Sequence, residues 1–132
     1  MLAPHVLVAA TAYGLADLCA FILTGAGYRV TAVRSGAEAD AALRAALTAF
    51  AAAVVDNAMS DLSGPQVIAA ERTRGSRLPF VLTSGSLNPS DLAALAPPVL
   101  LVRKPFCRAE LVRAVADAIS GPGGPHPAAP TV

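Results

Sequence analysis

Short apolar runs alternate with stretches of helical periodicity along the whole of this chain. The two clearest runs are Ala51–Asp56 and Val99–Arg103, and Lys104 follows the second directly. Apolar runs of this length, bounded by turn signals, are typical of strands buried on both faces of a parallel sheet. Open α/β sheets bind their ligands at the carboxyl ends of such strands. We therefore expect Asp56 and Lys104 to lie at one edge of a parallel sheet, as a site for a small anionic group.

Five β/α repeats can be read from the pattern. The expected strands are His5–Ala10, Tyr28–Val33, Ala51–Asp56, Pro79–Thr83 and Val99–Arg103. The expected helices are Leu15–Thr24, Ser35 to about Leu47, Ser63 to about Thr73, two turns from Ser90 ended by Pro97-Pro98, and Arg108–Ile119. Strands that alternate with helices through short connections predict a doubly wound, five-stranded parallel sheet with five helices on its two faces.

Two helix starts carry recognisable caps. Ser35 followed by Glu38 forms a capping box, in which the hydroxyl accepts from the first turn and the carboxylate reaches back. Ser63 precedes Gly64-Pro65, a cap followed by a proline that the first helical turn tolerates.

Composition excludes several classes of protein. The chain has 132 residues, 55% of them hydrophobic and 14% charged, which predicts a packed domain over residues 4–120. The remaining residues, 121–132, are rich in Gly, Pro and Ala and are expected to form a disordered tail. A net charge of +1 without a basic stripe argues against nucleic-acid binding. Cys19 and Cys107 match no metal-ligand spacing, which favours a reduced, cytoplasmic compartment.

A membrane or signal segment is also disfavoured. Val6–Tyr28 carries a single formal charge, Asp17, so both readings need to be weighed. No Lys or Arg precedes the apolar stretch, and Asp17 at the bilayer centre would cost ~3 kcal/mol. We expect a protein without a membrane partner.

Three segments together resemble the receiver domains of bacterial response regulators, the CheY-like family. Asp56-Asn57-Ala58-Met59-Ser60-Asp61-Leu62-Ser63-Gly64 is similar to their Asp-x-x-Met-Pro-x-Met-x-Gly loop. Pro79–Gly85 resembles their fourth strand, and Lys104-Pro105-Phe106 their closing Lys-Pro-Phe. The resemblance covers about residues 4–120 and implies a flavodoxin-like fold with strand order 2-1-3-4-5.

The resemblance also implies roles for individual residues. It makes Asp56 the phosphoacceptor, Ser84 and Lys104 phosphate-contacting side chains, and the backbone of Ala58 a further contact. It places the switch residue at Leu101 and a cis peptide bond before Pro105. The implied protein is a single-domain signalling module and not an enzyme, except for phosphotransfer to its own Asp56. The implied partners are a histidine kinase or phosphotransfer protein and a downstream protein, and a homodimer is compatible with the pattern.

The phosphotransfer chemistry follows from the residues themselves. A carboxylate can attack a phosphoryl group and form an acyl phosphate. The charge of the transition state then lies on equatorial oxygens, which need cations and hydrogen-bond donors around them. Lys104 supplies a cation, Ser84 a hydroxyl, and the Asn57-Ala58 loop backbone amides.

The sequence departs from the family where the metal would bind. Receivers carry an acidic pair after the first strand, and the matching residues here are Ala10 and Thr11. Asp17 lies further along the first helix, and Asp61 is expected to be a solvated charge in an outer loop. Mg²⁺ prefers carboxylate oxygens, so we expect its binding to be weak or absent.

Three functions remain open at this point. The first is a receiver that is phosphorylated at Asp56 in a phosphorelay despite an atypical metal site. The second is a pseudo-receiver, a protein-interaction module that works without phosphorylation. The third, a flavodoxin-like enzyme or cofactor binder, is disfavoured because Ala9-Ala10-Thr11-Ala12 contains no glycine-rich phosphate loop.

Overall fold

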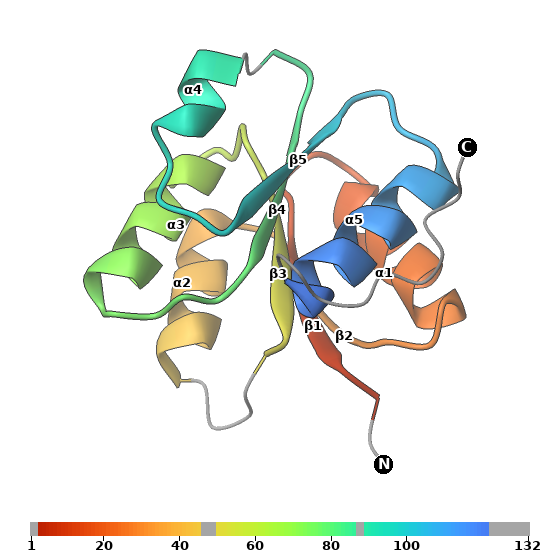
Figure 1. Ribbon diagram of the computed structural model, residues 1–132. Helices are drawn as coiled ribbons and strands as arrows, with labels where there is room; N and C mark the ends of the chain where they lie inside the picture. Colours follow the sequence, from red (N-terminus) through yellow and green to blue (C-terminus); the bar gives the residue numbers. More distant parts are fainter. Residues whose placement is uncertain (1–2, 46–49, 87–88, 122–132) are drawn as a thin grey trace.

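A parallel sheet lies between two layers of helices in the computed structural model, which describes residues 3–45, 50–86 and 89–121 (Figure 1). Its strands are β1 (His5–Ala9), β2 (Arg29–Val33), β3 (Ala52–Asp56), β4 (Phe80–Ser84) and β5 (Val99–Arg103). All pairs are parallel, and the order is β2-β1-β3-β4-β5. This confirms the predicted fold and strand order.

Helices cover both faces of the sheet. They are α1 (Leu15–Gly25), α2 (Gly36–Ala45), α3 (Gly64–Thr73), the short α4 (Pro89–Ala93) and α5 (Arg108–Ser120). Helices α1 and α5 lie on one face, whereas α2, α3 and α4 lie on the other (Figure 1). The predicted end of the second helix at Leu47 lies outside the described residues, and so does the predicted tail beyond Gly121.

The two central strands define the core. Every residue of β3 and β4 is buried, as expected for strands covered on both faces. Alternate residues face opposite layers, so Val54 and Val81 pack toward α1 and α5 while Val55 and Leu82 pack toward α2 and α3. The apolar face predicted for the last helix is confirmed, with Leu111 and Val115 fully buried and Val112 and Ile119 packed beside them.

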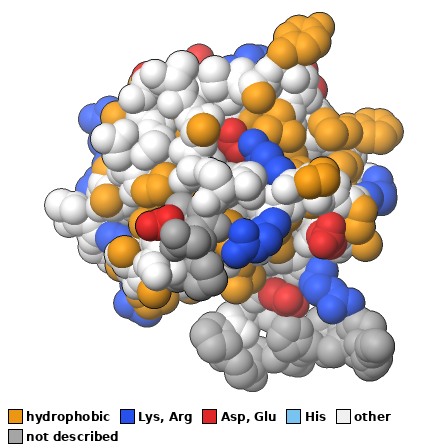
Figure 2. Space-filling view, turned by 90° about the horizontal axis from the view of Figure 1, so that it is seen from above, with side chains coloured by type: hydrophobic (Ala, Val, Ile, Leu, Met, Phe, Trp, Pro, Cys, Tyr) orange, Lys and Arg blue, Asp and Glu red, His pale blue; other side chains and the backbone are white. Residues whose placement is uncertain are grey.

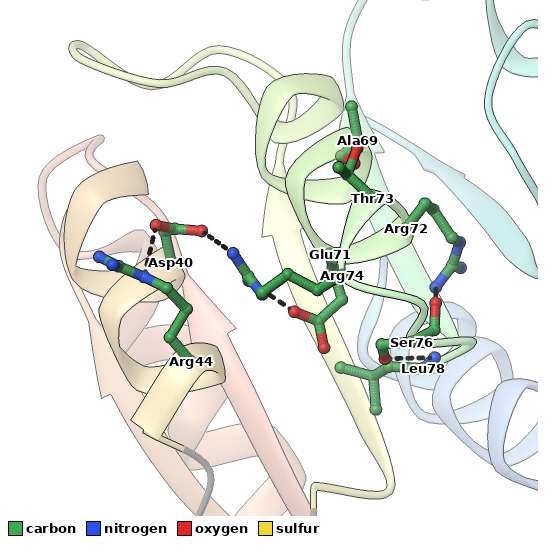
Figure 3. Close-up of polar contacts among 9 residues, drawn as sticks. All are labelled: Asp40, Arg44, Ala69, Glu71, Arg72, Thr73, Arg74, Ser76 and Leu78. Atoms are coloured by element: carbon green, nitrogen blue, oxygen red, sulfur yellow. Dashed lines mark hydrogen bonds and ion pairs between the residues drawn. The ribbon is translucent and has the colours of Figure 1, made fainter.

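A charged cluster joins α2 to the end of α3 (Figure 3). The guanidinium of Arg74 contacts Asp40 at 3.1 Å and Glu71 at 2.6 Å, while Arg44 contacts the other oxygen of Asp40 at 3.2 Å. The neighbouring Arg72 donates instead to the backbone oxygens of Ala96 and Pro98, ahead of β5. These contacts fix the α2–α3 layer at the end of the sheet opposite the predicted site.

The two predicted caps differ in outcome. Ser63 forms a full capping box, because its hydroxyl accepts from the amide of Gln66 at 3.2 Å and the Gln66 side chain accepts from the Ser63 amide at 2.9 Å. Ser35 accepts from the amide of Glu38 at 3.0 Å as predicted. The carboxylate of Glu38, however, reaches the amide of Arg34 at 2.7 Å, one residue earlier than a capping box requires.

The first amides of α2 are capped from a distant loop. Both oxygens of Asp61 accept from this turn, one from Gly36 and one from Ala37, each at 2.9 Å. A side chain at Gly36 would lie 2.3 Å from the backbone oxygen of Leu62, so only glycine permits this close approach. The prediction that Asp61 is merely a solvated loop charge was therefore wrong, because the loop folds back onto a helix end whose amides attract a carboxylate.

None of the helices in the described ranges is long and apolar enough to cross a membrane.

Candidate functional site at the carboxyl edge of the sheet

Three side chains meet where β3, β4 and β5 end. Asp56 is the last residue of β3 and is only 2% exposed. The ammonium of Lys104, which directly follows β5, lies 2.5 Å from Oδ1 of Asp56. The hydroxyl of Thr83 in β4 donates to the same oxygen at 2.7 Å. Asp56 and Lys104 are thus brought together as predicted, and Thr83 is a third member that sequence reasoning missed.

Strand register explains why these side chains meet. Asp56 and Thr83 are direct partners in the β3–β4 ladder, so they leave the sheet on the same face. That face continues the row of Val54, Val81 and Val102, which pack beneath α1 and α5. Since side chains alternate along a strand, the next polar residue in each row lies on the same face. The signal for Thr83 was therefore present in the sequence, but reading it needed the register.

Ser84, which the motif resemblance places at the phosphate, lies on the opposite face of the sheet from Thr83. It is the last residue of β4 and shares the alternation of Leu82, on the α3 side of the sheet. It is 3% exposed, and its hydroxyl accepts from the amide of Ser86 at 3.1 Å. β4 extends one residue beyond its predicted end at Thr83, so Ser84 belongs to the strand and not to the turn.

The other predicted positions also lie at this edge. Ala58 is exposed in the loop after β3, and Leu101 in β5 is partly buried against the α2–α3 layer. The peptide bond between Lys104 and Pro105 is cis, as predicted, and a second cis bond joins Pro97 to Pro98. Gly64 allows the loop after β3 to close, because a side chain there would lie 2.6 Å from the backbone oxygen of Asp56.

The positions that would hold a divalent cation carry no carboxylate. Ala10 is 3% exposed and packed in the apolar core. The hydroxyl of Thr11 donates to the backbone oxygen of Arg34 at 3.1 Å and accepts from the amide of Ser60 at 3.4 Å. These residues do not fit a Mg²⁺ site, because Asp56 is the one carboxylate among them and it is engaged by Lys104 and Thr83.

Neighbouring acidic residues do not fill that gap. Asp17 pairs with Arg34 at 2.8 Å on the surface of α1, and Asp61 caps α2. Across the described ranges, no group of three or more His, Cys, Asp or Glu side chains is arranged to hold a metal ion. Each carboxylate near the site thus has a separate structural partner.

A buried thiol lies beneath the charged corner. Cys19 of α1 is 2% exposed in the core under the site. Burial raises its pKa to about 11, with the nearby charge of Asp56 adding to the effect and that of Lys104 opposing it. The thiol therefore stays protonated at neutral pH, as expected for a core cysteine.

Exposed apolar side chains lie beside the site. Tyr13, Leu18 and Phe21, all in or just before α1, are largely exposed. A groove joins this surface to the site, because it includes both Leu18 and Lys104. Its lining residues are Ala12, Leu15, Leu18, Lys104, Pro105 and Phe106. Figure 2, which looks down on the carboxyl ends of the strands, shows apolar side chains projecting on the side where α1 lies. The family resemblance implied a contact surface formed by the fourth helix, the fifth strand and the fifth helix, and this additional surface was not predicted.

Comparison with solved structures places the chain in a family. It is 30% identical to a response regulator receiver protein from Sinorhizobium medicae, over 89% of this chain and 94% of that one, with a TM-score of 0.79. It is 26% identical to the signal receiver domain of a putative response regulator from Mycobacterium tuberculosis, over 92% of this chain and 100% of that one (TM-score 0.77).

A more distant likeness shows the fold alone. The receiver domain of a sensor histidine kinase from Pseudomonas aeruginosa, solved with a magnesium ion in its active-site cleft, is 22% identical. The match covers 90% of this chain and 99% of that one, with a TM-score of 0.78. No family model matches the sequence, and a search of curated proteins finds no significant match.

The chain belongs to the response-regulator receiver family. Its general role is that of a receiver domain in two-component signalling, with kinases or downstream effectors as its class of partner.

Proposed function

We propose that Asp56 is the phosphoacceptor of this receiver domain. The observation that carries the proposal is the position of its carboxylate, at the carboxyl end of a central strand and in contact with Lys104 and Thr83. A carboxylate held between a cation and a hydroxyl at such an edge is suited to receive an anionic group.

No proton is transferred in the proposed reaction. With acetyl phosphate as donor, a carboxylate oxygen of Asp56 attacks phosphorus and forms a P–O bond. The P–O bond to the acetyl group breaks, and acetate leaves with the electron pair. The product is an acyl phosphate on Asp56. The charge that builds up in the transition state lies on the three equatorial oxygens of the phosphoryl group.

Several groups are placed to stabilise that charge. The ammonium of Lys104 has three donors, so it can hold Asp56 and a phosphoryl oxygen at once. The hydroxyl of Thr83 contacts the carboxylate of Asp56, and the backbone amide of Ala58 lies at the same edge, so these two groups would supply further donors. Ser84, for which this role was expected, lies on the α3 side of the sheet.

The positions that would hold Mg²⁺ are occupied by Ala10 and Thr11, which do not fit the ion. The chain's own donors would therefore stabilise the charge of the transition state.

We infer that the phosphodonor is a protein, either a histidine kinase or a phosphotransfer protein. The exposed Tyr13, Leu18 and Phe21 lie in or just before α1, and the groove that includes Leu18 also includes Lys104. Large apolar side chains that gather at one place on a surface favour a protein partner. A donor docked over α1 would cover them while its phosphorylated residue approached Asp56.

The test is direct phosphorylation by a small donor. Wild type, Asp56→Asn and Asp17→Asn are incubated with millimolar acetyl phosphate, with Mg²⁺ or with a chelator, and measured by intact-protein mass spectrometry. We expect a phosphoryl adduct on wild type and Asp17→Asn, and none on Asp56→Asn. Asp17 is a matched control because it is an ion-paired aspartate on the same side of the sheet. An adduct that persists in Asp56→Asn, or its absence from folded wild type, would reject the proposal.

A second candidate function is a pseudo-receiver that binds its partner without phosphorylation. Two observations favour it: Ala10 and Thr11 replace the acidic pair, and Asp56 is buried and already neutralised by Lys104. In that case Asp56→Asn would change stability only modestly and leave partner binding intact. Loss of partner binding in this variant, measured by calorimetry with the cognate protein, would count against the pseudo-receiver.

A further inference from the structure

The loop that follows Asp56, residues 57–63, is closed at its base beside the site. The amide of Asn57 donates to the backbone oxygen of Thr83 at 2.8 Å, and the amide of Gly64 donates to the backbone oxygen of Asn57 at 3.1 Å. Gly64 also lies so close to the backbone of Asp56 that no side chain fits there. The position of the loop and the position of Asp56 are therefore coupled through the backbone.

The far end of this loop is bound to the first turn of α2. Asp61 accepts from the amides of Gly36 and Ala37, one on each carboxylate oxygen, both at 2.9 Å. Hydrogen bonds to an ionised acceptor are roughly twice as strong as bonds between neutral groups. Leu62 lies so close to Gly36 that a side chain there would meet its backbone oxygen. Polar and steric contacts together fix the tip of the loop on α2.

A second contact holds the loop beside the end of β1. The amide of Ser60 donates to the hydroxyl of Thr11 at 3.4 Å, and this hydroxyl donates to the backbone oxygen of Arg34 at 3.1 Å. Thr11 thus joins the loops that follow β1, β2 and β3. Because Ser60 and Asp61 are neighbours, the two contacts hold the same part of the loop, and the bond from Asp61 is the stronger of them.

Helix α2 also has a local cap, which separates two roles that Asp61 could have. Ser35 accepts from the amide of Glu38 at 3.0 Å, one residue further along the same first turn. Asp61 and Ser35 both satisfy free amides of this helix end, but only Asp61 ties it to the loop that follows Asp56. If Asp61 were only a helix cap, loss of either residue would have the same kind of effect.

We propose that Asp61 is a positioning residue of the site, which binds the loop after β3 to α2 and so holds the backbone at Asn57 and Ala58 in place beside Asp56. This inference rests on the proposed function of Asp56 as the phosphoacceptor. No bond to Asp61 forms or breaks in the reaction described above. Its effect is to keep the loop ordered before the phosphodonor arrives, so that the amide donors need no rearrangement in the transition state.

The test compares the two caps of α2 in the folded protein. Asp61→Ala removes the cap that comes from the loop, and Ser35→Ala, the matched control, removes the local cap of the same helix. We expect the rate of adduct formation from acetyl phosphate to fall about tenfold in Asp61→Ala, the size of effect expected for one lost hydrogen bond to a charged group. The rate of Ser35→Ala should equal that of wild type. Asp61→Asn keeps an oxygen that can accept from the turn, and it should recover part of the rate.

Hydrogen exchange measures the anchoring of the loop without phosphorylation. The amides of residues 57–62, followed by mass spectrometry, should exchange faster in Asp61→Ala than in wild type, because the loop opens more often once its anchor is lost. In Ser35→Ala any increase should be confined to α2.

Four results would contradict the inference, and one of them also tests the proposed function. An unchanged rate in folded Asp61→Ala, while wild type is phosphorylated, would overturn the positioning role alone. Equal losses of rate in Asp61→Ala and Ser35→Ala would assign Asp61 to the stability of α2 and overturn that role as well. Unchanged exchange of residues 57–62 in Asp61→Ala would show that Asp61 does not anchor the loop. Folded wild type that gives no adduct would reject the proposed function and this inference together.

Discussion

The carboxyl ends of β1 and of β3–β5 form one edge of the same sheet but differ in chemistry. At β3–β5 an ammonium and a hydroxyl each lie within hydrogen-bond distance of the same carboxylate. At β1, Ala10 is packed in the core and Thr11 is bonded to neighbouring backbone. The strands at both ends are held by their ladders and by apolar packing. The architecture therefore does not require a charged group at the end of β1.

Removal of the Lys104 ammonium from the carboxyl ends of β3–β5 should have the largest effect on stability. Lys104→Met leaves the carboxylate of Asp56 buried and without its ion pair, and we expect the free energy of unfolding to fall by about 2 kcal/mol. Lys104 is a third exposed, which keeps the loss at the low end for buried pairs. Urea denaturation measures it. Adding Asp56→Asn should recover much of the loss, and a single variant as stable as wild type would mean that the pair contributes nothing.

Rebuilding the β1 end tests whether the difference between the two ends is a matter of metal binding. The double substitution Ala10→Asp with Thr11→Asp should destabilise the free protein, because it adds two carboxylates near Asp56. Saturating Mg²⁺ should then raise its free energy of unfolding by about 1–3 kcal/mol, the linkage expected at ten to a hundred times the dissociation constant. Thermal unfolding of wild type should not respond to Mg²⁺. The matched control is Ala10→Asn with Thr11→Asn, and a response of wild type equal to that of the Asp variant would remove the distinction.

The next effect concerns Asp61, whose carboxylate caps the first turn of α2. Hydrogen bonds from the amides of Ala37, Leu62 and Gly36 lower its pKa below the ordinary value of 3.8. A lowered pKa means that its contribution to stability is present above 3.8 and is lost as pH falls through the folded value. The stability gap between wild type and Asp61→Asn, measured in urea, should be widest near neutral pH and close in acid. A gap that does not change with pH would show that Asp61 does not act as a charged cap.

The smallest effect is expected for Cys19, which is buried beneath the site. The pKa of Cys19 is raised to about 11 by burial and by Asp56, so its thiol should not react with a thiol reagent near pH 8 in the native state. Cys107 is exposed and should react. We expect one reactive thiol per native chain and a second in urea, with Cys107→Ala as the variant that removes the native signal. Rapid labelling of both thiols in the native protein would contradict the packing described for α1.

Much of the fold could be predicted from the sequence because each element carries its own local signal. The strand Val99–Arg103 was placed without error, and the apolar run, the flanking Pro97-Pro98 and the helix pattern after Cys107 explain why. Most other boundaries moved by one or two residues, as hydrogen-bond ladders end where partners end. The ion pair of Asp56 with Lys104 was also predictable, since both residues follow buried strands and parallel strands end at one edge.

The main errors have a different cause. The hydroxyl of Thr83 and the cap from Asp61 onto α2 both depend on which distant segments lie opposite each other. No local pattern states that register. The shift of Glu38 to the amide of Arg34 is instead a local difference of one residue in the cap. Thr83 was overlooked because the neighbouring Ser84 matched the motif, and only the pairing of Asp56 with Thr83 in the ladder reveals which hydroxyl faces the carboxylate.

By itself the sequence determined the succession of strands and helices, the two apolar faces and the loss of acidic residues after β1, because periodicity and residue type are written along the chain. Only the tertiary structure decided which polar groups share a hydrogen bond. Such bonds form over about three ångströms between residues that are far apart in sequence, and a shift of one residue along a strand turns a side chain to the other face of the sheet.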